Sequence, residues 1–374
     1  MDFIIQKKIF STLVTEVVKA CPAQSVLPTL TGLKIQVEKD GVTLTGGNTE
    51  LFIQKTIPLQ MDGENVLEVL KPGCGLVPAK HFAELIKKLP GSVRVSMQAA
   101  HIIVSSEGIT TKLSSYGDAI YPELPDFQTK QSIELPLGQL KAAIGQTVFA
   151  VAKNDSKPVL TGVNIQVERD RLICTATDSH RLAQSVVPAT SNMDDSFVVP
   201  SKGLAEISSL KAAETALIKI SKNGQFAVFQ CENSILYTVL LEGMYPKTES
   251  LLPTEFVTTI VLDTEQFRAG IDRACLFSGE WKHNNIQLEI VSKDQVTIAS
   301  KSTDVGELEE VQSILQMEGQ LPIQMTFDGK YLLDALKGIQ ARTIMIGFNG
   351  LMKPVLIRPD SHYSTIQLLS PLRA

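Results

Sequence analysis

The chain is poor in the features that mark membrane proteins, metal sites and disulfide-bonded domains. Its 374 residues contain no apolar run that approaches the roughly 18 residues of a membrane-spanning helix. Its five cysteines are spread out and form no Cys-x-x-Cys pair, which favours buried free thiols. Trp281 is the single tryptophan, and we expect it in the core or at a subunit contact. No metal and no cofactor is expected.

Signature motifs of common enzyme classes are also missing. The sequence contains no Walker A motif, no Gly-x-Gly-x-x-Gly, no His-Glu-x-x-His and no Gly-x-Ser-x-Gly elbow. One polar cluster, Thr177–Leu182, does place Asp178, Ser179 and His180 in succession. A catalytic triad draws its members from separate segments, whereas consecutive strand residues alternate between faces. The cluster therefore favours a non-catalytic role, and a hydrolase built on this strand is the alternative.

The balance of charge and the start of the chain bear on partners and location. The formal net charge of −5 argues against a protein that is basic throughout. It does not exclude nucleic acid, because binding depends on where the positive charges lie. Residues Met1–Lys8 alternate as a strand does, where a signal peptide would carry a charged and then an apolar segment. We therefore expect a cytoplasmic protein.

An internal repeat is the strongest signal in the sequence. The segment Gly32–Asp40 reads almost identically to Gly162–Asp170, and this offset of 130 holds without a gap over Leu30–Glu50. A third version, Lys293–Ile298, matches Lys39–Leu44. Each copy alternates apolar and polar residues on both sides of a charged turn, which predicts a β-hairpin.

Two amphipathic helical patterns recur with the hairpins. The first is carried by Phe10, Leu13, Val14, Val17 and Val18, by Leu140, Ile144 and Val148, and by Phe267 and Ile271. The second begins at Pro78, Pro200 and Gly329. In each of these three places a lysine precedes the first apolar helix residue by two positions, namely Lys80, Lys202 and Lys330. Spacings of three and four predict helices with one buried face.

The repeat predicts three tandem domains of one kind. Tyr121–Pro125 and Tyr245–Pro253 have the proline pattern of extended exits from the first two copies. We expect domains at 1–127, 128–253 and 254–374, with 128–132 as a linker. Two helices packed on about eight antiparallel strands per copy make the fold class α+β.

Basic residues return beside the predicted helices. They are Lys7, Lys8, Lys19, Lys80, Lys87, Lys88, Lys141, Lys202, Lys211, Arg268, Arg273, Lys330 and Lys337. Each of them alone fits an ordinary solvated helix face. Their recurrence in three copies favours a surface that meets phosphates without reading base sequence.

Four segments in order along the chain resemble the bacterial DNA sliding clamps, the β subunits of the replicative polymerase. The segments are Lys157–Gly162, Ala176–Leu182, Glu242–Pro246 and Gln367–Arg373. The resemblance implies a non-enzymatic processivity factor for DNA replication and repair. It also implies a head-to-tail homodimer that closes a six-domain ring around duplex DNA, with the helices lining the hole. Implied partners are the clamp loader, the replicative polymerase α subunit and other proteins with a clamp-binding motif.

The resemblance also assigns roles to individual residues. It implies a cleft between the second and third domains for an extended peptide with a glutamine and apolar anchors, formed by Leu160, Thr177, His180, Arg181, Leu182, Pro246, Leu251, Leu368, Leu369, Ser370, Pro371 and Arg373. The residues expected to face DNA are Gln24, Lys80, Lys141, Lys153, Lys202 and Lys330. The expected subunit interface sets Leu276 and Phe277 against His81, Phe82 and Leu85 of a second copy.

Several positions depart from the family pattern. Gln24 stands where an arginine is common, Glu249 and Ser250 where basic residues are frequent, and Ser370 where a large apolar residue usually floors the cleft. Ala374 is less bulky than the last residue of many relatives. Two further alternatives therefore remain: a specialised or accessory clamp with altered partner binding, and a ring-shaped scaffold that does not encircle DNA.

Overall fold

A computed structural model describes the chain except residues 117–120, 126–130, 155–156, 278–284, 304 and 373–374. The described part contains six α-helices and antiparallel β-sheets, so the predicted α+β class is confirmed. None of the helices in these ranges is long and apolar enough to cross a membrane. Trp281 and Arg373 lie outside the described residues.

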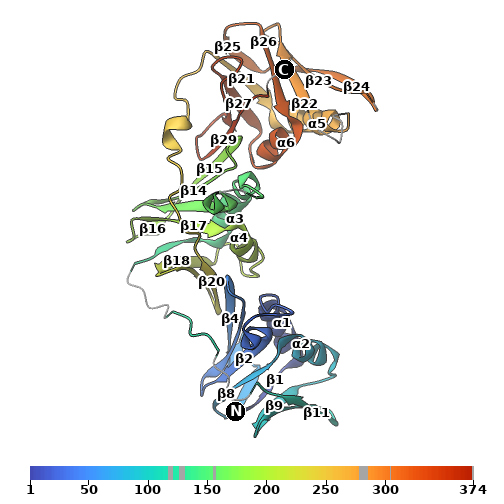
Figure 1. Cartoon of the computed structure of the whole chain (residues 1–374), viewed down its shortest axis with the longest axis vertical. Coiled ribbons are helices and arrows are strands. Elements are labelled where there is room, and N and C mark those ends of the chain that lie inside the picture. Colours follow the sequence, from blue (N-terminus) through green and yellow to red (C-terminus); the bar gives the residue numbers. More distant parts are fainter. Residues whose placement is uncertain (117–120, 126–130, 155–156, 278–284, 304, 373–374) are drawn as a thin grey trace. The chain divides into compact units, whose positions relative to one another are not determined.

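The three copies share one order of main elements, namely a strand, a helix, five strands, a second helix and three strands, and the first copy adds the short hairpin β5–β6 (Figure 1). The first has β1 (Asp2–Ile5), α1 (Lys7–Val18), η1 (Pro28–Thr31), β2 (Gly32–Val37), β3 (Gly41–Gly47), β4 (Leu51–Pro58), β5 (Gln60–Met61), β6 (Glu64–Asn65), β7 (Leu67–Lys71), β8 (Gly73–Pro78), α2 (Ala79–Lys88), β9 (Val93–Gln98), β10 (His101–Ser106) and β11 (Ile109–Ser114). The second has β12 (Ile133–Pro136), α3 (Leu137–Gly145), η2 (Val148–Ala150), η3 (Pro158–Thr161), β13 (Gly162–Val167), β14 (Arg171–Thr177), β15 (Arg181–Pro188), β16 (Thr190–Ser191), β17 (Asp195–Pro200), α4 (Ser201–Ser208), β18 (Leu217–Asn223), β19 (Phe226–Cys231) and β20 (Ser234–Val239). The short helix η4 (Glu249–Leu251) then leads to the third, with β21 (Thr258–Asp263), α5 (Thr264–Cys275), β22 (Asn285–Ile290), β23 (Gln295–Ser302), β24 (Gly306–Ser313), β25 (Gln316–Gly319), β26 (Ile323–Asp328), α6 (Gly329–Lys337), β27 (Thr343–Phe348), β28 (Val355–Pro359) and β29 (Thr365–Leu369).

The chain folds as two compact units that cut across the sequence repeat. One unit contains Met1–Leu137 and Leu210–Leu240, and the other contains Gly138–Ser209 and Leu241–Ala374. The second copy is thus divided between them. The compact units follow sheets that two copies share, so they do not test where one copy ends and the next begins. The domain limits at 127 and 253 therefore stay a prediction.

In the first unit, one sheet joins strands of two copies. The strands of this sheet that belong to the first unit have the order β12-β18-β19-β20-β4-β3-β2-β8, so β20 of the second copy pairs with β4 of the first. The other sheet has the order β11-β10-β9-β1-β7 and belongs to the first copy alone. We call the β4–β20 pairing the first junction.

The second unit repeats this arrangement. Its nine-stranded sheet has the order β17-β13-β14-β15-β29-β28-β27-β21-β25, so β29 of the third copy pairs with β15 of the second. The remaining sheet, β24-β23-β22-β26, belongs to the third copy. We call the β15–β29 pairing the second junction.

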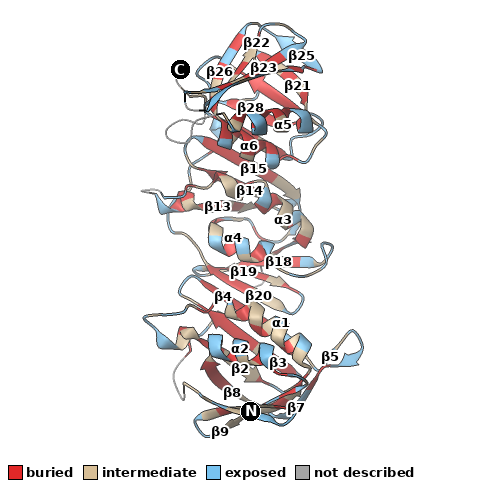
Figure 2. Cartoon of the chain, turned by 90° about the vertical axis from the view of Figure 1, so that its right-hand side faces the viewer, coloured by how far each residue is buried: buried red, intermediate tan, exposed pale blue. Residues whose placement is uncertain are grey.

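Helix packing in the first copy follows from the spacing of its apolar residues. Phe10, Val14 and Val17 lie one or two turns apart on α1 and are fully buried. The ring of Phe10 meets Phe3 of β1 and Phe82 of α2 edge-on, each at a centroid distance of 5.8 Å. Figure 2 shows the strands largely buried, while α2 carries exposed residues as well. The aromatic contacts join both helices to the sheet.

Helices α2, α4, α5 and α6 begin directly after a proline or an aspartate. Pro78 and Pro200 precede α2 and α4, and a proline there needs no backbone hydrogen bond. Asp263 caps α5 by accepting a hydrogen bond from the Gln266 backbone, and Asp328 caps α6 in the same way. The second helix therefore occupies the equivalent place in each of the three copies, with its lysine in the first turn.

Candidate functional site

The turn between β14 and β15 forms the polar centre of the predicted partner site. The Asp178 carboxylate accepts hydrogen bonds of 3.0 Å from the backbone nitrogens of His180 and Arg181. The Thr177 hydroxyl donates to the Arg181 carbonyl at 2.7 Å. Ser179 sits at the tip with φ +75°, a conformation that non-glycine residues adopt rarely. The polar atoms are thus used to hold a tight turn.

This geometry does not support the hydrolase alternative. A triad needs a carboxylate that orients the histidine ring and a histidine that faces the serine hydroxyl. The Asp178 side chain instead binds backbone nitrogens and the Arg181 guanidinium, at 3.0 Å from Nε. The cluster is a structural turn.

Arg181 is the most connected residue of the site. Its side chain is only 8% exposed and pairs with Asp178 at 3.0 Å and with Asp334 of α6 at 2.9 Å. It also donates to the Phe149 carbonyl at 2.5 Å, and its guanidinium lies 4.1 Å from the ring centroid of Tyr331. Arg181 thereby ties the β14–β15 turn of the second copy to α6 of the third.

The sequence pattern does not reveal three partners of this arginine. Phe149, Tyr331 and Asp334 lie far from Arg181 in the sequence, and their spacing alone fits ordinary helix residues. Burial, with the charge of Asp178 next, raises the pKa of the Tyr331 hydroxyl. The one available signal in the sequence is the pair Lys330 and Tyr331 at the start of α6, where only the lysine belongs to the repeated basic pattern.

Two apolar clusters flank the turn. Leu182 faces Leu368 across the second junction and packs with Met345 and Leu356. Leu160 belongs to a second cluster with Tyr245, among others. Predicted cleft residues therefore anchor both clusters.

The remaining predicted cleft residues divide between surface and core. Leu251 is 54% exposed, and Thr177 and Arg181 are buried while His180, Pro246 and Ser370 are exposed. Pro371 is half-buried. The Ser370 nitrogen donates to the His180 carbonyl at 2.9 Å, so the chain end runs beside the turn.

Leu369 requires a correction. Its side chain is 2% exposed and lies in the core of the third copy, whereas its neighbour Leu368 lies in the cluster of Leu182. Successive strand residues point to opposite faces. A direct role for the Leu369 side chain in a partner site was therefore a wrong prediction.

Gln146, the residue after α3, links the two strands of the second junction through hydrogen bonds. Gln146 accepts hydrogen bonds from the hydroxyls of Ser185 at 2.7 Å and Thr365 at 3.0 Å. The Gln367 amide donates to the Gln146 carbonyl at 3.1 Å. Both strands of the junction are thus bound to one side chain and its backbone, which fixes the site above them.

The residues expected to face DNA occupy equivalent places in their copies. Lys80, Lys202 and Lys330 are each the second residue of α2, α4 and α6, and all are exposed. Gln24 and Lys153 are exposed in the loops that precede η1 and η3. Lys141 is half-buried in α3. The repeat thus presents its basic residues in matching positions.

Several other helix cations are bound within the chain. The pairs are Lys87 with Glu84, Lys211 with Glu16, Arg268 with Glu265, and Arg273 with Glu310. Cations held by carboxylates are weaker candidates for phosphate contacts, because the carboxylate offsets their charge. The recurrent basic set is therefore smaller than the sequence indicated.

The residues expected at a subunit interface are mostly accessible. Leu276 is 72% exposed, His81 is exposed, and Leu85 and Phe277 are half-buried. Phe82 is the exception, since it is 0% exposed and packs on Phe10. Its side chain belongs to the core and offers no surface to a partner, which corrects that prediction.

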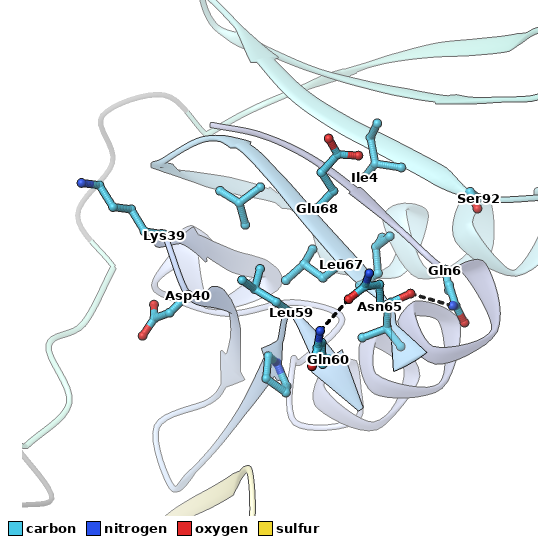
Figure 3. Close-up of a pocket in the computed structure, with 14 residues that line it drawn as sticks. Ile4, Gln6, Lys39, Asp40, Leu59, Gln60, Asn65, Leu67, Glu68 and Ser92 are labelled. Carbon is cyan, nitrogen blue, oxygen red and sulfur yellow. Dashed lines mark hydrogen bonds between the residues drawn. The ribbon is translucent and has the colours of Figure 1, made fainter. Parts of the chain in front are cut away.

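A groove of about 850 Å³ lies elsewhere, beside strand β7 of the first copy. Figure 3 shows it between Lys39 and Asp40 on one rim and the Gln60–Asn65 hairpin on another. The Asn65 side chain accepts from Gln60 at 2.8 Å. None of the residues predicted for partner, DNA or subunit contacts lines it. Within the described chain, no group of three His, Cys, Asp or Glu side chains could hold a metal ion.

Comparison with known proteins identifies the family. Models of the N-terminal, central and C-terminal domains of the DNA polymerase III β subunit match residues 1–125, 134–247 and 249–373 in this order. The β sliding clamp of Bacillus subtilis is 35% identical over 377 residues, which covers both chains completely. The chain belongs to the bacterial β sliding clamp family.

Further relatives of this clamp agree with that assignment. The β sliding clamp of Staphylococcus aureus strain Mu50 is 34% identical and covers 100% of the chain and 99% of the relative. The crystal structure of the Bacillus subtilis clamp covers 100% and 99% of the two chains with a TM-score of 0.95 at 34% identity. The β subunit of Streptococcus pyogenes covers both chains completely, with a TM-score of 0.92 at 30% identity.

Membership settles the class of function. The clamp is a non-catalytic processivity subunit of DNA polymerase III, made of three β-clamp domains. The hydrolase alternative is thereby wrong. The sequence prediction of the family, the fold and the non-enzymatic function is confirmed.

Proposed function

We propose that this clamp closes into a six-domain ring as a head-to-tail homodimer and encircles duplex DNA in the cytoplasm. The support comes from the sheet edges. At both junctions the fourth main strand of one copy, β4 or β15, pairs with the last strand of the next, β20 or β29. Their counterparts β24 and β11 end their sheets within the described chain. A strand edge offers unpaired backbone groups to another chain, so β24 of one subunit would pair with β11 of a second.

The repeat also gives the register of that pairing. Lys55, Ser185 and Glu310 occupy equivalent positions of the fourth strand in the three copies. Each faces an equivalent residue of the preceding strand: Lys55 faces Leu44, Ser185 faces Cys174, and Glu310 faces Ile298. Across the first junction Lys55 faces Ser234, the first residue of β20. The first residue of β11 is Ile109. We therefore infer that Glu310 faces Ile109 and that Glu307 faces Lys112, which sets opposite charges side by side.

Contact with DNA would be made through phosphates alone. Lys80, Lys202 and Lys330 stand exposed in the first turns of matching helices. Lysine binds phosphate as a point charge and does not read base edges, so such contacts permit sliding. A closed ring would retain the DNA by topology, and the partner polymerase would be held at high effective concentration.

Partner proteins would bind at the second junction through an extended peptide. Leu182, Leu368 and Leu160 supply apolar anchors, and the turn at His180 supplies polar groups at the surface. The proposed partners are the polymerase α subunit, the clamp loader and other clamp-motif proteins. The rigidity that Arg181 gives to the turn reduces the conformational entropy lost when a peptide binds.

Loading onto circular DNA tests the ring. The clamp, incubated with a clamp-loader ATPase, ATP and singly nicked circular plasmid, is expected to co-elute with the plasmid in gel filtration at high salt. Cutting the plasmid with a restriction enzyme should then release the clamp, because it slides off the ends. Retention on linear DNA would contradict topological binding. Failure to load on circles would favour a scaffold that does not encircle DNA.

One observation favours the accessory-clamp alternative. Ser370 is exposed beside His180, so a small polar side chain lies where the partner peptide would pass. An accessory clamp predicts weaker binding of the polymerase peptide than Ser370→Met shows in the same assay. Equal affinity of the two proteins would contradict it.

A further inference from the structure

The first junction carries a row of residues that lie side by side across three strands. Gly47 of β3 faces Phe52 of β4, and Phe52 faces Tyr237 of β20. Phe52 and Tyr237 are 5% and 3% exposed. The Phe52 ring meets Tyr121 edge-on with centroids 6.5 Å apart, and the Tyr237 hydroxyl donates to Gln54 at 3.3 Å. Aromatic rings therefore fill this junction.

The absence of a side chain at Gly47 leaves room for the Phe52 ring. A Cβ atom at this position would collide with the ring of Phe52 and with the Leu51 carbonyl. The exit segment Tyr121–Pro125 of the first copy packs on the same cluster, where Tyr121 is 8% exposed and Leu124 is half-buried. The rings and this segment therefore belong to one cluster.

The second junction carries the same row with smaller side chains. Thr177 of β14 faces Leu182 of β15, and Leu182 faces Leu368 of β29. These residues stand where the first junction has Gly47, Phe52 and Tyr237 in the same register. Leucine fills less volume than an aromatic ring. Both rows are buried, so the junctions differ in the size of the side chains that they hold, aromatic rings in the first and leucines in the second.

The exit segments of the first two copies differ in length. Tyr121 and Pro125 are four positions apart, whereas Tyr245 and Pro253 are eight positions apart. The longer segment packs Tyr245 and Leu252 on the clusters of the second junction. It also includes η4, whose Leu251 is 54% exposed.

We propose that the first junction is a partner site already filled by the chain itself, and that Phe52 and Tyr237 restrict partner peptides to one site per chain. Gly47 acts as a positioning residue that admits the Phe52 ring. The proposal rests on the peptide site proposed at the second junction, and it adds the reason why a repeated architecture offers that site only once.

Exchange of the row tests the proposal. Thr177→Gly/Leu182→Phe/Leu368→Tyr transplants the filling into the second junction of the full-length clamp. The probe is a synthetic peptide copying the last ten residues of the host DNA polymerase III α subunit, titrated by isothermal calorimetry. We expect one peptide per chain for the wild type and at least tenfold weaker binding for the exchange variant. Thermal melting and light scattering confirm that the variant keeps its fold and its mass.

Two controls separate filling from general damage. Ile357→Leu changes a buried residue in the core of the third copy, outside the row, and keeps its volume, so this variant should bind as the wild type does. Phe52→Leu/Tyr237→Leu alters the first junction and should leave the second-junction affinity within twofold. Should the triple variant not fold, Thr177→Gly/Leu182→Phe replaces it with the same expectation.

The outcomes are distinct. Wild-type affinity in a folded exchange variant, or two peptides per wild-type chain, overturns the filled-junction proposal while leaving peptide binding itself intact. No peptide binding by the wild type contradicts the proposed function as well. One peptide per chain, with binding at least tenfold weaker on exchange and kept in both controls, supports the proposal.

Discussion

Arg181 donates a 2.9 Å hydrogen bond to Asp334, a residue 153 positions further along the chain. This bond joins the second and third copies below the predicted partner site. With Asp178 on its other side, the guanidinium is paired twice and is buried. The site is therefore held by an ion-pair network and does not rest on apolar packing alone.

Removing this arginine should destabilise the second unit markedly. Arg181→Ala leaves the buried Asp178 carboxylate unpaired, and the expected loss is about 3 kcal/mol of the free energy of unfolding. Asp334 is 38% exposed, so Asp334→Asn should cost only about 1 kcal/mol. Urea unfolding followed by circular dichroism measures both. Equal losses in the two variants would contradict the network as described.

The stability of the first unit should depend on Glu16 in acid. Glu16 binds buried Lys55 at 2.5 Å and Lys211 at 3.1 Å. Burial raises the pKa of its carboxyl, but the hydrogen bonds and charges of these lysines outweigh burial and hold it below its ordinary value of 4.5. A lowered folded-state pKa adds stability that is complete above the unfolded-state value and is lost as the pH falls through the folded-state value.

Glu16→Gln should therefore be about 2 kcal/mol less stable than the wild type at pH 7, because a buried ammonium loses its charged partner. The difference should shrink as the pH falls below 4.5 and through the lowered pKa of the folded state, where the wild type loses the same interaction. Glu84→Gln, at an exposed pair with Lys87, serves as the control and should change little. A gap between Glu16→Gln and wild type that stays constant with pH would exclude this account.

The inferred subunit register predicts a specific cross-link. Leu308 should face Thr111 of the second subunit, and antiparallel partners have Cα atoms about 4.5–5.5 Å apart, within disulfide range. Leu308→Cys/Thr111→Cys, made in a Cys74→Ser background because Cys74 is exposed, should give covalent dimers on a non-reducing gel. The control Leu308→Cys/Leu113→Cys is two positions out of register. Preferential linking of the control would shift the register, and a dimer that links in neither variant would exclude this pairing.

The three matching lysines should account for much of the salt dependence of DNA binding. Removing the charges of Lys80, Lys202 and Lys330 by glutamine substitution should lower the slope of log K against log salt by up to about 0.9 for each phosphate that the clamp no longer neutralises. Fluorescence anisotropy with duplex DNA measures that slope. Lys87→Gln, whose lysine already pairs with Glu84, is the matched control. Equal slopes for triple variant and control would place the phosphate-binding residues elsewhere.

Much of the fold could be predicted because the repeat is local in sequence. The hairpins at Gly32 and Gly162 and the helices that begin near Lys80, Lys202 and Lys330 follow from periodicity and from residues a few positions apart. Spacing does not say which neighbour an apolar helix residue meets. Phe82 shows this, because its position fits a subunit interface as well as the core, and only its packing on Phe10 distinguishes them.

The candidate site was predictable in its strands and unpredictable in its supports. Thr177, Leu182 and Leu368 lie in recognisable segments, and the structure brings them into one row. Arg181 finds Phe149 and Tyr331 through tertiary packing, which no local pattern encodes. Alternation along β29 separates Leu368 from Leu369, and a motif read as a continuous string does not express that difference.

The ladders at Phe52–Tyr237 and Leu182–Leu368 have a consequence for the ancestry of the chain. The sequence repeat and the compact structural units have different boundaries, because the second copy is divided between the two units. A solitary ancestral copy would have carried both of the strand edges that now pair at the junctions, and association with a second such copy would have covered them. Fusion into one chain made those pairings contacts between covalent neighbours, and the proposed ring would use the same pairing once more between β24 and β11.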